Sequence, residues 1–307
     1  MAVDEPREPA SGLTVVIPAH DEEGGVGPTI DAIRAAFAAR PTALEILVVD
    51  DGSTDATAAR AATAGARVVS HPHRIGYGRA LKSGILAAAH DVIAITDADG
   101  TYPVEELPRM LELLAAHDLV IGARTGPLYR RTLLRSPPRT LFLLLASFVA
   151  GRWIPDPNSG LRVFRRREVL PLLPDLPRGF SFTTTQTLVM TLGGAFIHFH
   201  FVDYRPRIGH SKIRFLRQSL QVGQGLVEVV LRHNPLKIFL LAALVPLLAA
   251  LLVPLCARGG DAALVAGAVL TSTSLLILAL GMLAVVALRR RPVESSRDKA
   301  LTRSPAA

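Results

Sequence analysis

The chain has little of several residue types, and each shortage excludes a class of site. Its 307 residues include one cysteine, Cys256, so neither an intramolecular disulfide nor a zinc site built from cysteines can form. Aromatic residues make up only 5% and are not interleaved with the basic ones, which argues against a nucleic-acid-binding surface. Acidic residues are outnumbered, 26 Asp and Glu against 34 Lys and Arg, so we expect an anionic partner such as lipid or a phosphorylated small molecule.

Half of the residues are hydrophobic, and they gather toward the C-terminus. Residues 236–257 and 262–288 are each long enough, at about 1.5 Å per residue, to cross a hydrocarbon core about 30 Å thick. Because only a short linker separates them, they predict a transmembrane hairpin. Basic residues flank both outer ends, namely Arg232, Lys237 and residues 289–291. The positive-inside rule therefore predicts a multi-pass protein of the cell (inner) membrane with both termini cytoplasmic.

Two shorter segments have the character of helices at a membrane surface. Residues 213–235 form a basic, amphipathic juxtamembrane segment, which is typical of helices that lie in the lipid interface. The apolar run 141–150 is too short to span a bilayer, so it is either a buried helix or a second interfacial one. We expect disordered tails at residues 1–12, which contain no signal peptide, and at the cytoplasmic residues 289–307.

Residues 13–212 have the pattern of one α/β domain. Short β-branched runs alternate with Ala-rich helical stretches, which predicts a doubly wound, Rossmann-like, mostly parallel sheet with helices on both faces. Strands are expected at 13–17, 44–49, 67–69, 92–96, 118–121 and 196–202, and helices at 28–39, 56–64, 77–89 and 103–116. In such a domain, ligands bind in the crevice at the carboxyl ends of the strands.

Three polar segments follow predicted strands and should therefore meet in that crevice. Asp97-Ala98-Asp99 holds two carboxylates that repel each other unless a cation neutralises them, which favours Mg²⁺ or Mn²⁺. The alternative is that one of the two caps a turn while the other is solvated. Residues 50–55 can accept hydrogen bonds from a base or a ribose, and they can equally cap the next helix. Residues 18–23 form a polar loop, which is weak evidence when taken alone.

Three other patterns do not indicate a site. Residues 78–83 (GRALKS) are similar to the end of a phosphate-binding loop, but Leu81 stands where that motif requires glycine. No GxGxxG motif follows the first strand, which removes the main support for a dinucleotide-binding domain. His198 and His200 share one face of a predicted strand without a third ligand, so a half-exposed strand is favoured over a metal site.

Six motifs together resemble the inverting family 2 glycosyltransferases with a GT-A fold. Four of them are VVIPAHDEE (15–23), VVDDGSTD (48–55), GYGRALKSG (76–84) and TDADGTYP (96–103). The other two, DPNSGLRVF (156–164) and GHSKI (209–213), are similar to the polyprenyl-phosphate branch, which includes the dolichol-phosphate mannosyltransferases. Bacterial members that load undecaprenyl phosphate also carry a C-terminal hairpin. The sequence departs from the family at residues 20–21, where a Tyr-Asn pair is common, and at residues 100–101, where some members have a metal-assisting glutamine.

The resemblance implies a role for each matching residue. A UDP- or GDP-linked sugar would contact Pro18, Ala19, His20, Glu22, Asp51, Lys82, Asp97 and Ala98. Asp97 and Asp99 would hold Mg²⁺ or Mn²⁺ on the diphosphate, and catalysis would depend on these two together with Arg124 and Asp156. Asp156 would orient the acceptor or act as a base. The phosphate of the polyprenyl acceptor would be bound by Arg135, Arg139, Ser159, Arg207 and Lys212.

The implied reaction moves a hexose from a nucleotide-diphosphate sugar to a polyprenyl phosphate at the bilayer. The acceptor needs little general-base help, because the second pKa of a phosphate monoester is about 6. One alternative is a family 2 enzyme with a saccharide or another lipid as acceptor, but the QxxRW motif of processive synthases is absent. A second alternative is a non-catalytic, membrane-tethered nucleotide-sugar-binding protein. A homo-oligomer is compatible with the sequence.

Overall fold

The computed structural model describes residues 12–127, 129, 137–207, 223–231, 235–256 and 260–289. The chain forms two compact units, and the boundary between them falls between Leu226 and Val227. Within the predicted amphipathic segment 213–235, residues 223–231 form a helix. Most of that segment lies outside the described residues, as do nearly all of both predicted tails.

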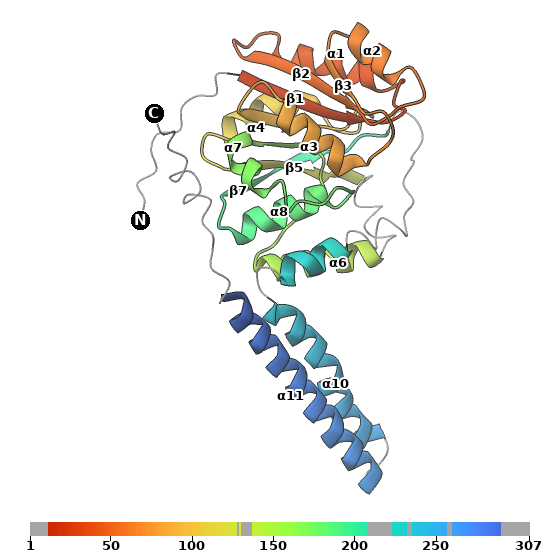
Figure 1. Ribbon diagram of the computed structural model, residues 1–307, viewed down its shortest axis with the longest axis vertical. Coiled ribbons are helices and arrows are strands. Elements are labelled where there is room, and N and C mark those ends of the chain that lie inside the picture. Colours follow the sequence, from red (N-terminus) through yellow and green to blue (C-terminus); the bar gives the residue numbers. More distant parts are fainter. Residues whose placement is uncertain are drawn as a thin grey trace, which may run out of the picture. The chain divides into compact units, whose positions relative to one another are not determined.

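The first unit is built on a seven-stranded sheet of order β3-β2-β1-β4-β6-β5-β7 (Figure 1). The strands are β1 (Gly12–Ala19), β2 (Ala43–Asp50), β3 (Arg67–Ser70), β4 (Val92–Ile95), β5 (Leu119–Thr125), β6 (Arg162–Arg165) and β7 (Ile197–Asp203). All are parallel except β6, which runs antiparallel to its neighbours β4 and β5. The mostly parallel α/β sheet predicted from the sequence is confirmed.

Helices cover both faces of this sheet, as the sequence predicts (Figure 1). The helices of this unit are α1 (Val26–Phe37), α2 (Thr57–Thr63), α3 (Tyr77–Ala87), η1 (Val104–Glu106), α4 (Leu107–Leu113), α6 (Pro137–Ala150), α7 (Arg166–Val169), η2 (Leu170–Leu172) and α8 (Phe182–Leu192). Of these, α6 packs against α8. One apolar core joins the sheet to α1, α2 and α4, and a second joins it to α3, α7 and α8. The central strand β1 is buried along its whole length, because side chains on both of its faces enter one of these cores.

The direction of the strands decides what gathers at one edge of the sheet. The carboxyl ends of β1, β2, β4, β5 and β7 lie along the same edge, since these strands are parallel. Because β6 runs the other way, its amino end lies there too. The loop 156–160 precedes β6 and is thereby brought beside the residues that follow β4 and β5.

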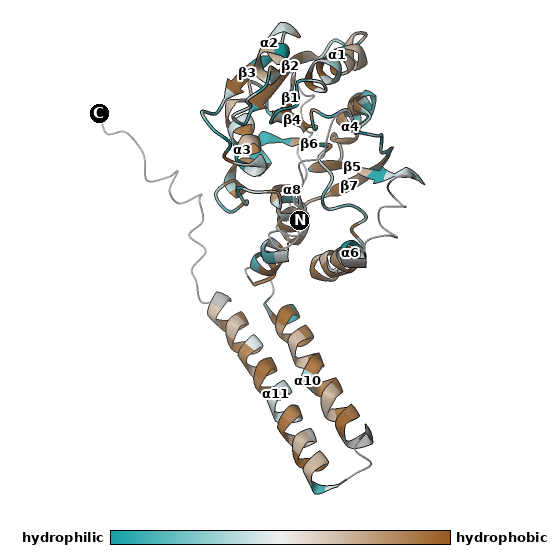
Figure 2. Cartoon of the chain, turned by 90° about the vertical axis from the view of Figure 1, so that its right-hand side faces the viewer, coloured by the Kyte–Doolittle hydropathy of each residue, from teal (hydrophilic) through white to brown (hydrophobic). Residues whose placement is uncertain are grey.

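The second unit contains α10 (Leu236–Cys256) and α11 (Asp261–Arg289), which agree within one residue with the two predicted spans. Both are long and apolar enough to cross a membrane, and Figure 2 colours most of their residues as hydrophobic. The two helices pack closely, since Ser274 Oγ donates to the carbonyl of Ala243 at 2.9 Å and a Cβ on Gly281 would lie 2.5 Å from Cβ of Phe239. Most of their large apolar side chains are exposed, so these are not the core helices of a water-soluble domain.

Candidate active site

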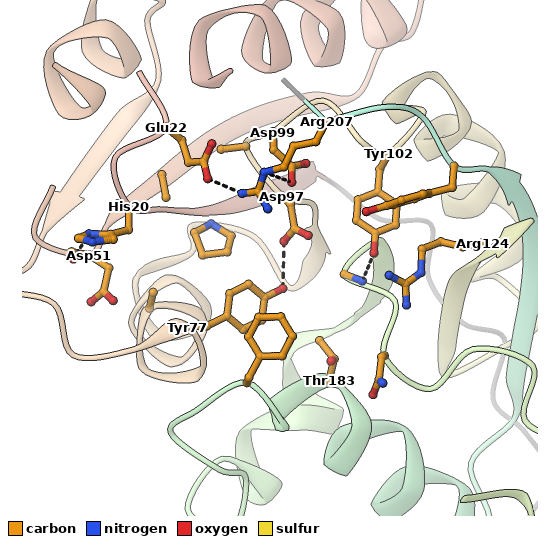
Figure 3. Close-up of a pocket in the computed structure, with 18 of the residues that line it drawn as sticks. His20, Glu22, Asp51, Tyr77, Asp97, Asp99, Tyr102, Arg124, Thr183 and Arg207 are labelled. Carbon is orange, nitrogen blue, oxygen red and sulfur yellow. Dashed lines mark hydrogen bonds and ion pairs between the residues drawn. The ribbon is translucent and has the colours of Figure 1, made fainter. Parts of the chain in front are cut away.

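A pocket of about 430 Å³ opens at the carboxyl edge of the sheet (Figure 3). Most of the residues expected from the sequence line it: Pro18, Ala19, His20, Glu22, Asp51, Asp97, Ala98, Asp99, Arg124, Arg139 and Arg207. Figure 3 shows His20 and Asp51 at one end, Arg124 at the other, and Asp97 between them. Acidic groups therefore occupy one end and the middle, while Arg124 brings positive charge to the opposite end.

Asp51 follows β2 and anchors the loop that leads into α3. Its Oδ2 accepts from the backbone N–H of Gly76 at 2.8 Å, and its Oδ1 accepts from that of Ile75 at 3.0 Å. His71 Nδ1 lies 2.9 Å from the same Oδ1. Burial acts to raise the pKa of Asp51, but these hydrogen bonds outweigh it and hold the pKa below its usual value. Beside it, Nδ1 of His20 is 3.0 Å from the carbonyl oxygen of Asp51, which fixes the imidazole at this end of the pocket.

Asp97 and Asp99 follow β4 and lie at the centre of the pocket. The hydroxyl of Tyr77 donates to Asp97 Oδ1 at 3.1 Å, while the hydroxyl of Thr101 donates to Asp99 Oδ1 at 2.6 Å. Burial raises the pKa of Asp97 to about 7, and the charge of Asp99 adds to this rise. A Cβ on Gly160 would lie 3.0 Å from an oxygen of Asp97, so this glycine packs closely against the carboxylate.

Arg207 forms ion pairs with two carboxylates of the pocket. Its Nη2 is 2.5 Å from Glu22 Oε1 and its Nε is 3.3 Å from Asp99 Oδ2. Burial lowers the pKa of this guanidinium, but Asp99 and Glu22 more than offset that effect and raise it. Arg207 was predicted to bind the acceptor phosphate, and the structure instead pairs it with two carboxylates of the predicted donor side.

The two aspartates fit a divalent metal. Carboxylate oxygens are the ligands that Mg²⁺ and Mn²⁺ prefer, and Mg²⁺ is commonly held by one or two carboxylates together with substrate phosphates and water. Within the described part of the chain, no three His, Cys, Asp or Glu residues are arranged to hold a metal by themselves. The donor set of Asp97 and Asp99 therefore suits an ion that also binds a diphosphate. His198 and His200 lie on β7, and among the described residues no third potential ligand joins them.

Arg124 extends from β5 at the opposite end of the pocket. Its Nε is 2.7 Å from Asp156 Oδ2 and its Nη2 is 2.8 Å from Asp156 Oδ1, so the pair is bidentate. The rings of Tyr129 and Tyr204 flank the guanidinium, with centroids 5.1 and 5.4 Å from Cζ. The carboxylate is 1% exposed and does not line the pocket. Burial acts to raise the pKa of Asp156, but Arg124 outweighs it and holds the pKa below its usual value.

The structure places three of the predicted site residues outside the lining of the pocket. Asp156 is turned to Arg124, whose guanidinium donates to its carboxylate and holds its pKa below the usual value. Lys82 does not line the pocket, because its ammonium donates to the carbonyls of Leu173 and Leu176, each at 2.5 Å. Ser159 is fully buried, and its hydroxyl donates to the carbonyl of Gly122 at 2.5 Å, so it does not reach a phosphate in the pocket. The remaining predictions, Arg135 and Lys212, lie outside the described residues.

The sequence analysis missed the aromatic lining of the pocket. All four tyrosines of the chain line it, together with Phe180: Tyr77, Tyr102, Tyr129 and Tyr204. Tyr77 lies 5.5 Å from Phe180 between ring centroids, and Tyr102 lies edge-on to Tyr204 at 5.8 Å. The hydroxyl of Tyr102 also accepts from the backbone N–H of Gly160 at 2.7 Å. Two of these tyrosines stand inside recognised motifs, which is the signal that could have found them.

Comparison with known proteins identifies relatives of this arrangement. The model of the family described as "Glycosyl transferase family 2" matches residues 14–171. A dolichyl-phosphate hexose transferase of Haloferax volcanii is 31% identical over 226 residues, which cover 72% of this chain and 95% of that protein. An undecaprenyl-phosphate 4-deoxy-4-formamido-L-arabinose transferase of Pseudomonas fluorescens is 30% identical over 59% of this chain and 57% of its own.

Several solved structures have a similar fold. Glucosyl-3-phosphoglycerate synthase from Mycobacterium tuberculosis, crystallised with Mg²⁺ and UDP, is 27% identical. It superposes with a TM-score of 0.58 over 71% of this chain and 79% of that one.

Proposed function

Since the chain belongs to glycosyltransferase family 2, we propose that it transfers a hexose from a nucleotide-diphosphate sugar to a polyprenyl phosphate. The observation that carries this proposal is the pocket itself, which Asp97, Asp99 and Arg124 line together, in a chain that also has two helices long and apolar enough to cross a membrane. Relatives named for dolichyl and undecaprenyl phosphate acceptors support the choice of acceptor. The chain is a glycosyltransferase and a membrane protein.

The donor would lie along the acidic side of the pocket. His20 and Asp51, which line one end of the pocket, would contact the base and the ribose. Asp97 and Asp99 would hold Mg²⁺ or Mn²⁺, which supplies positive charge to the departing diphosphate. The structural relative bound to Mg²⁺ and UDP supports a divalent metal here and a UDP-linked donor. Arg207 also lies on this side and can contact the diphosphate once it parts from Glu22 and Asp99.

The acceptor would enter from the basic end of the pocket. Arg124 and Arg139 line this end and can bind the phosphate through charge-assisted hydrogen bonds. A phosphate oxygen then attacks the anomeric carbon as the bond to the diphosphate breaks, which inverts the sugar in a single step. The dianionic acceptor needs no deprotonation, which agrees with the absence of a candidate base at Asp156. Most of the protein's contribution is to hold two anions together in a fixed geometry.

The membrane helices set where this chemistry occurs. We infer that both termini and the catalytic unit are cytoplasmic, because basic residues flank the outer ends of α10 and α11. The hairpin then keeps the enzyme in the same bilayer as its lipid acceptor. A lipid anchored in one plane and an enzyme anchored in the same plane meet without a search in three dimensions.

A transfer assay tests this proposal. The full chain, reconstituted in liposomes with undecaprenyl phosphate, is given a panel of UDP-, GDP- and dTDP-sugars with and without Mn²⁺ or Mg²⁺. We expect a metal-dependent glycolipid, and a loss of more than about 100-fold in Asp99→Asn, since that carboxylate stabilises transition-state charge through the metal. The matched control is Asp31→Asn, which changes an exposed aspartate on α1 far from any motif.

Two outcomes would contradict the proposal in different ways. Donor binding without a lipid product across the panel would overturn the polyprenyl-phosphate acceptor and favour a saccharide or another lipid. Failure to turn over any donor with any acceptor, despite tight donor binding, would favour a nucleotide-sugar-binding protein.

A further inference from the structure

One aromatic ring in the pocket is shared by two arginines. Cζ of Arg124 lies 5.1 Å from the ring centroid of Tyr129, and Cζ of Arg139 lies 5.5 Å from the same centroid. Both distances are within the range of a cation–π interaction. Arg124 comes from β5 and Arg139 from the first turns of α6, so the ring of Tyr129 joins two elements that are separate in the sequence.

The charges around this ring leave an excess of positive charge. Asp156 neutralises Arg124 through two hydrogen bonds, and the charge of Arg139 also helps to lower the pKa of Asp156. The hydroxyl of Tyr129 hydrogen-bonds Asp156 as well, and burial next to this carboxylate raises the pKa of Tyr129 to about 12. Tyr129 therefore stays neutral at physiological pH. Two cations and one anion remain, so the group has an unmatched positive charge facing the pocket.

The hydrogen bonds that Arg124 already makes indicate which of its N–H groups can still bind a ligand. Its Nε, Nη2 and backbone N–H all donate to Asp156. Within the described residues, Nη1 of Arg124 makes no hydrogen bond, so its protons are left for a ligand in the pocket. Guanidinium groups bind phosphate oxygens well when their planes are fixed in advance, because less rotamer entropy is then lost on binding.

We propose that Tyr129 is a positioning residue that holds Arg124 and Arg139 as a pair on the phosphate of the lipid acceptor. This inference rests on the proposed function, and it assigns a role to a residue that stands outside all six sequence motifs. The ring offsets part of the repulsion between the two guanidinium groups and fixes both side chains on one side of the pocket. Tyr204 cannot do the same, since its ring faces Arg124 but makes no such contact with Arg139 within the described residues.

A positioning role for Tyr129 and a simple packing role predict effects on different substrates. Tyr129 is 6% exposed, so its ring also fills space against neighbouring atoms. A packing residue would affect folding and both substrates alike, whereas a ring that pairs two arginines affects the acceptor and leaves the donor side unchanged. The ring, rather than the hydroxyl, carries the interaction with both guanidinium groups.

The test compares Tyr129→Phe, which keeps the ring, with Tyr129→Leu, which removes it, in the full chain reconstituted in liposomes. We expect Tyr129→Leu to raise the KM for undecaprenyl phosphate about tenfold, because two cation–π contacts are lost, while the KM for the donor changes less than about twofold. Tyr129→Phe should stay within about threefold for both substrates. Phe196→Leu, an exposed aromatic outside the pocket, is the matched control.

A double-mutant cycle asks whether Tyr129 acts through Arg139. In an Arg139→Gln background the acceptor KM is already raised, and adding Tyr129→Leu should increase it less than about twofold further. An unchanged acceptor KM in Tyr129→Leu alone would overturn the inference. Equal rises for donor and acceptor, or a Phe variant as impaired as the Leu variant, would also overturn it and leave a packing role.

A binding measurement separates failure of this inference from failure of the proposed function. Farnesyl phosphate, a short soluble polyprenyl phosphate, is titrated by calorimetry into the detergent-solubilised full chain and its two Tyr129 variants. Binding that weakens about tenfold in the Leu variant and not in the Phe variant supports the inference even if no sugar is transferred. Transfer by the wild type with identical farnesyl phosphate binding in all three proteins overturns the inference and leaves the function standing.

Discussion

Arg124 and Asp156 illustrate how a side chain behind the pocket controls one that lines it. The carboxylate of Asp156 is buried and the guanidinium of Arg124 reaches into the pocket. The ion pair therefore holds this guanidinium, which extends from β5, in a fixed position. Breaking a buried ion pair from one side leaves the other charge without a partner in a poorly solvated place. The contribution of Asp156 should therefore be visible in stability as well as in activity.

We expect Asp156→Asn to destabilise the protein by about 3 kcal/mol, because Arg124 would keep its charge without the carboxylate that balances it. The thermal unfolding midpoint of the detergent-solubilised full chain measures this. Glu112→Gln is the control, since Glu112 pairs with Arg40 and Arg109 on the surface, where solvent screens such pairs and they contribute little to stability. A midpoint for Asp156→Asn no lower than that of Glu112→Gln would show that the buried pair does not stabilise the fold.

His198 gives the first unit a pH-dependent stability. Burial lowers its pKa below 6.5, and the nearby His117 and His200 lower it further. The unfolded chain therefore binds a proton more readily than the folded one, so stability is lost as pH falls from about 6.5 through the lower folded pKa. We expect the unfolding midpoint to drop between pH 7.5 and 5.5 by less in His198→Gln than in the wild type. His73→Gln, at an exposed histidine, should behave as the wild type, and equal drops in all three proteins would contradict the prediction.

The sequence located the site residues at strand ends but could not orient all of them. Asp51, Asp97 and Arg124 follow parallel strands, whose carboxyl ends must meet at one edge, so their convergence was predictable. Lys82 and Ser159 lie in the right motifs, but their side chains satisfy carbonyls of the domain itself. Membership in a motif indicates the neighbourhood of a residue, whereas the direction of its side chain depends on which polar groups the fold leaves unsatisfied.

At the scale of elements, β6 and α8 are two whose residue types do not predict the structure they adopt. β6 reads RVFR, and two arginines in four residues suggest an exposed segment. Arg162 is in fact fully buried, donating to the carbonyls of Ser159 and Thr183 and to Gln186, and burial lowers its pKa to about 10. α8 contains five threonines, which have weak helix propensity, and tertiary packing overrides that preference. By contrast, β1, β2 and β4 were predictable because burial on both faces demands continuous apolar runs.

α6 has two apolar sides, only one of which the domain covers. Leu143, Ala146 and Val149 are buried, whereas Leu141, Leu144 and Phe148 are 58%, 53% and 43% exposed. A stripe of large exposed apolar side chains on one helix is typical of a surface that contacts lipid. We expect this exposed face of α6 to lie in the headgroup region of the bilayer, where the acceptor phosphate also lies.

The fluorescence of Trp153 can test whether this face of α6 contacts lipid. Trp153 is the only tryptophan of the chain and lies just beyond α6, where it is 63% exposed. In liposomes, its fluorescence should be quenched by lipids spin-labelled near the headgroup and protected from aqueous iodide. Leu144→Glu, which changes an exposed side chain of α6, should weaken the lipid quenching, while Thr140→Ser on the same helix should not. Strong iodide quenching without lipid quenching would place this face of α6 in water.

At the scale of the whole molecule, the two units of the chain correspond to the two substrates of the reaction. The donor is water-soluble and the acceptor is confined to a bilayer, so the reaction needs a soluble fold held at a membrane. The α/β unit provides strand ends for the donor, and α10 with α11 provides residence in the membrane. The alternation of predicted strands and helices encodes the α/β unit, and two long apolar segments encode α10 and α11.

The side of the membrane on which the pocket lies is the remaining whole-molecule prediction. Basic residues before α10 and after α11 predict that the short linker between the two helices faces outward. In a Cys256→Ala background, a cysteine placed at the linker by Gly259→Cys should react with a membrane-impermeant maleimide on intact cells. Ser304→Cys, in the C-terminal tail, should react only after the cells are permeabilised. The reverse pattern would place the pocket outside the cytoplasm, away from the pool of nucleotide sugars that the proposed reaction consumes.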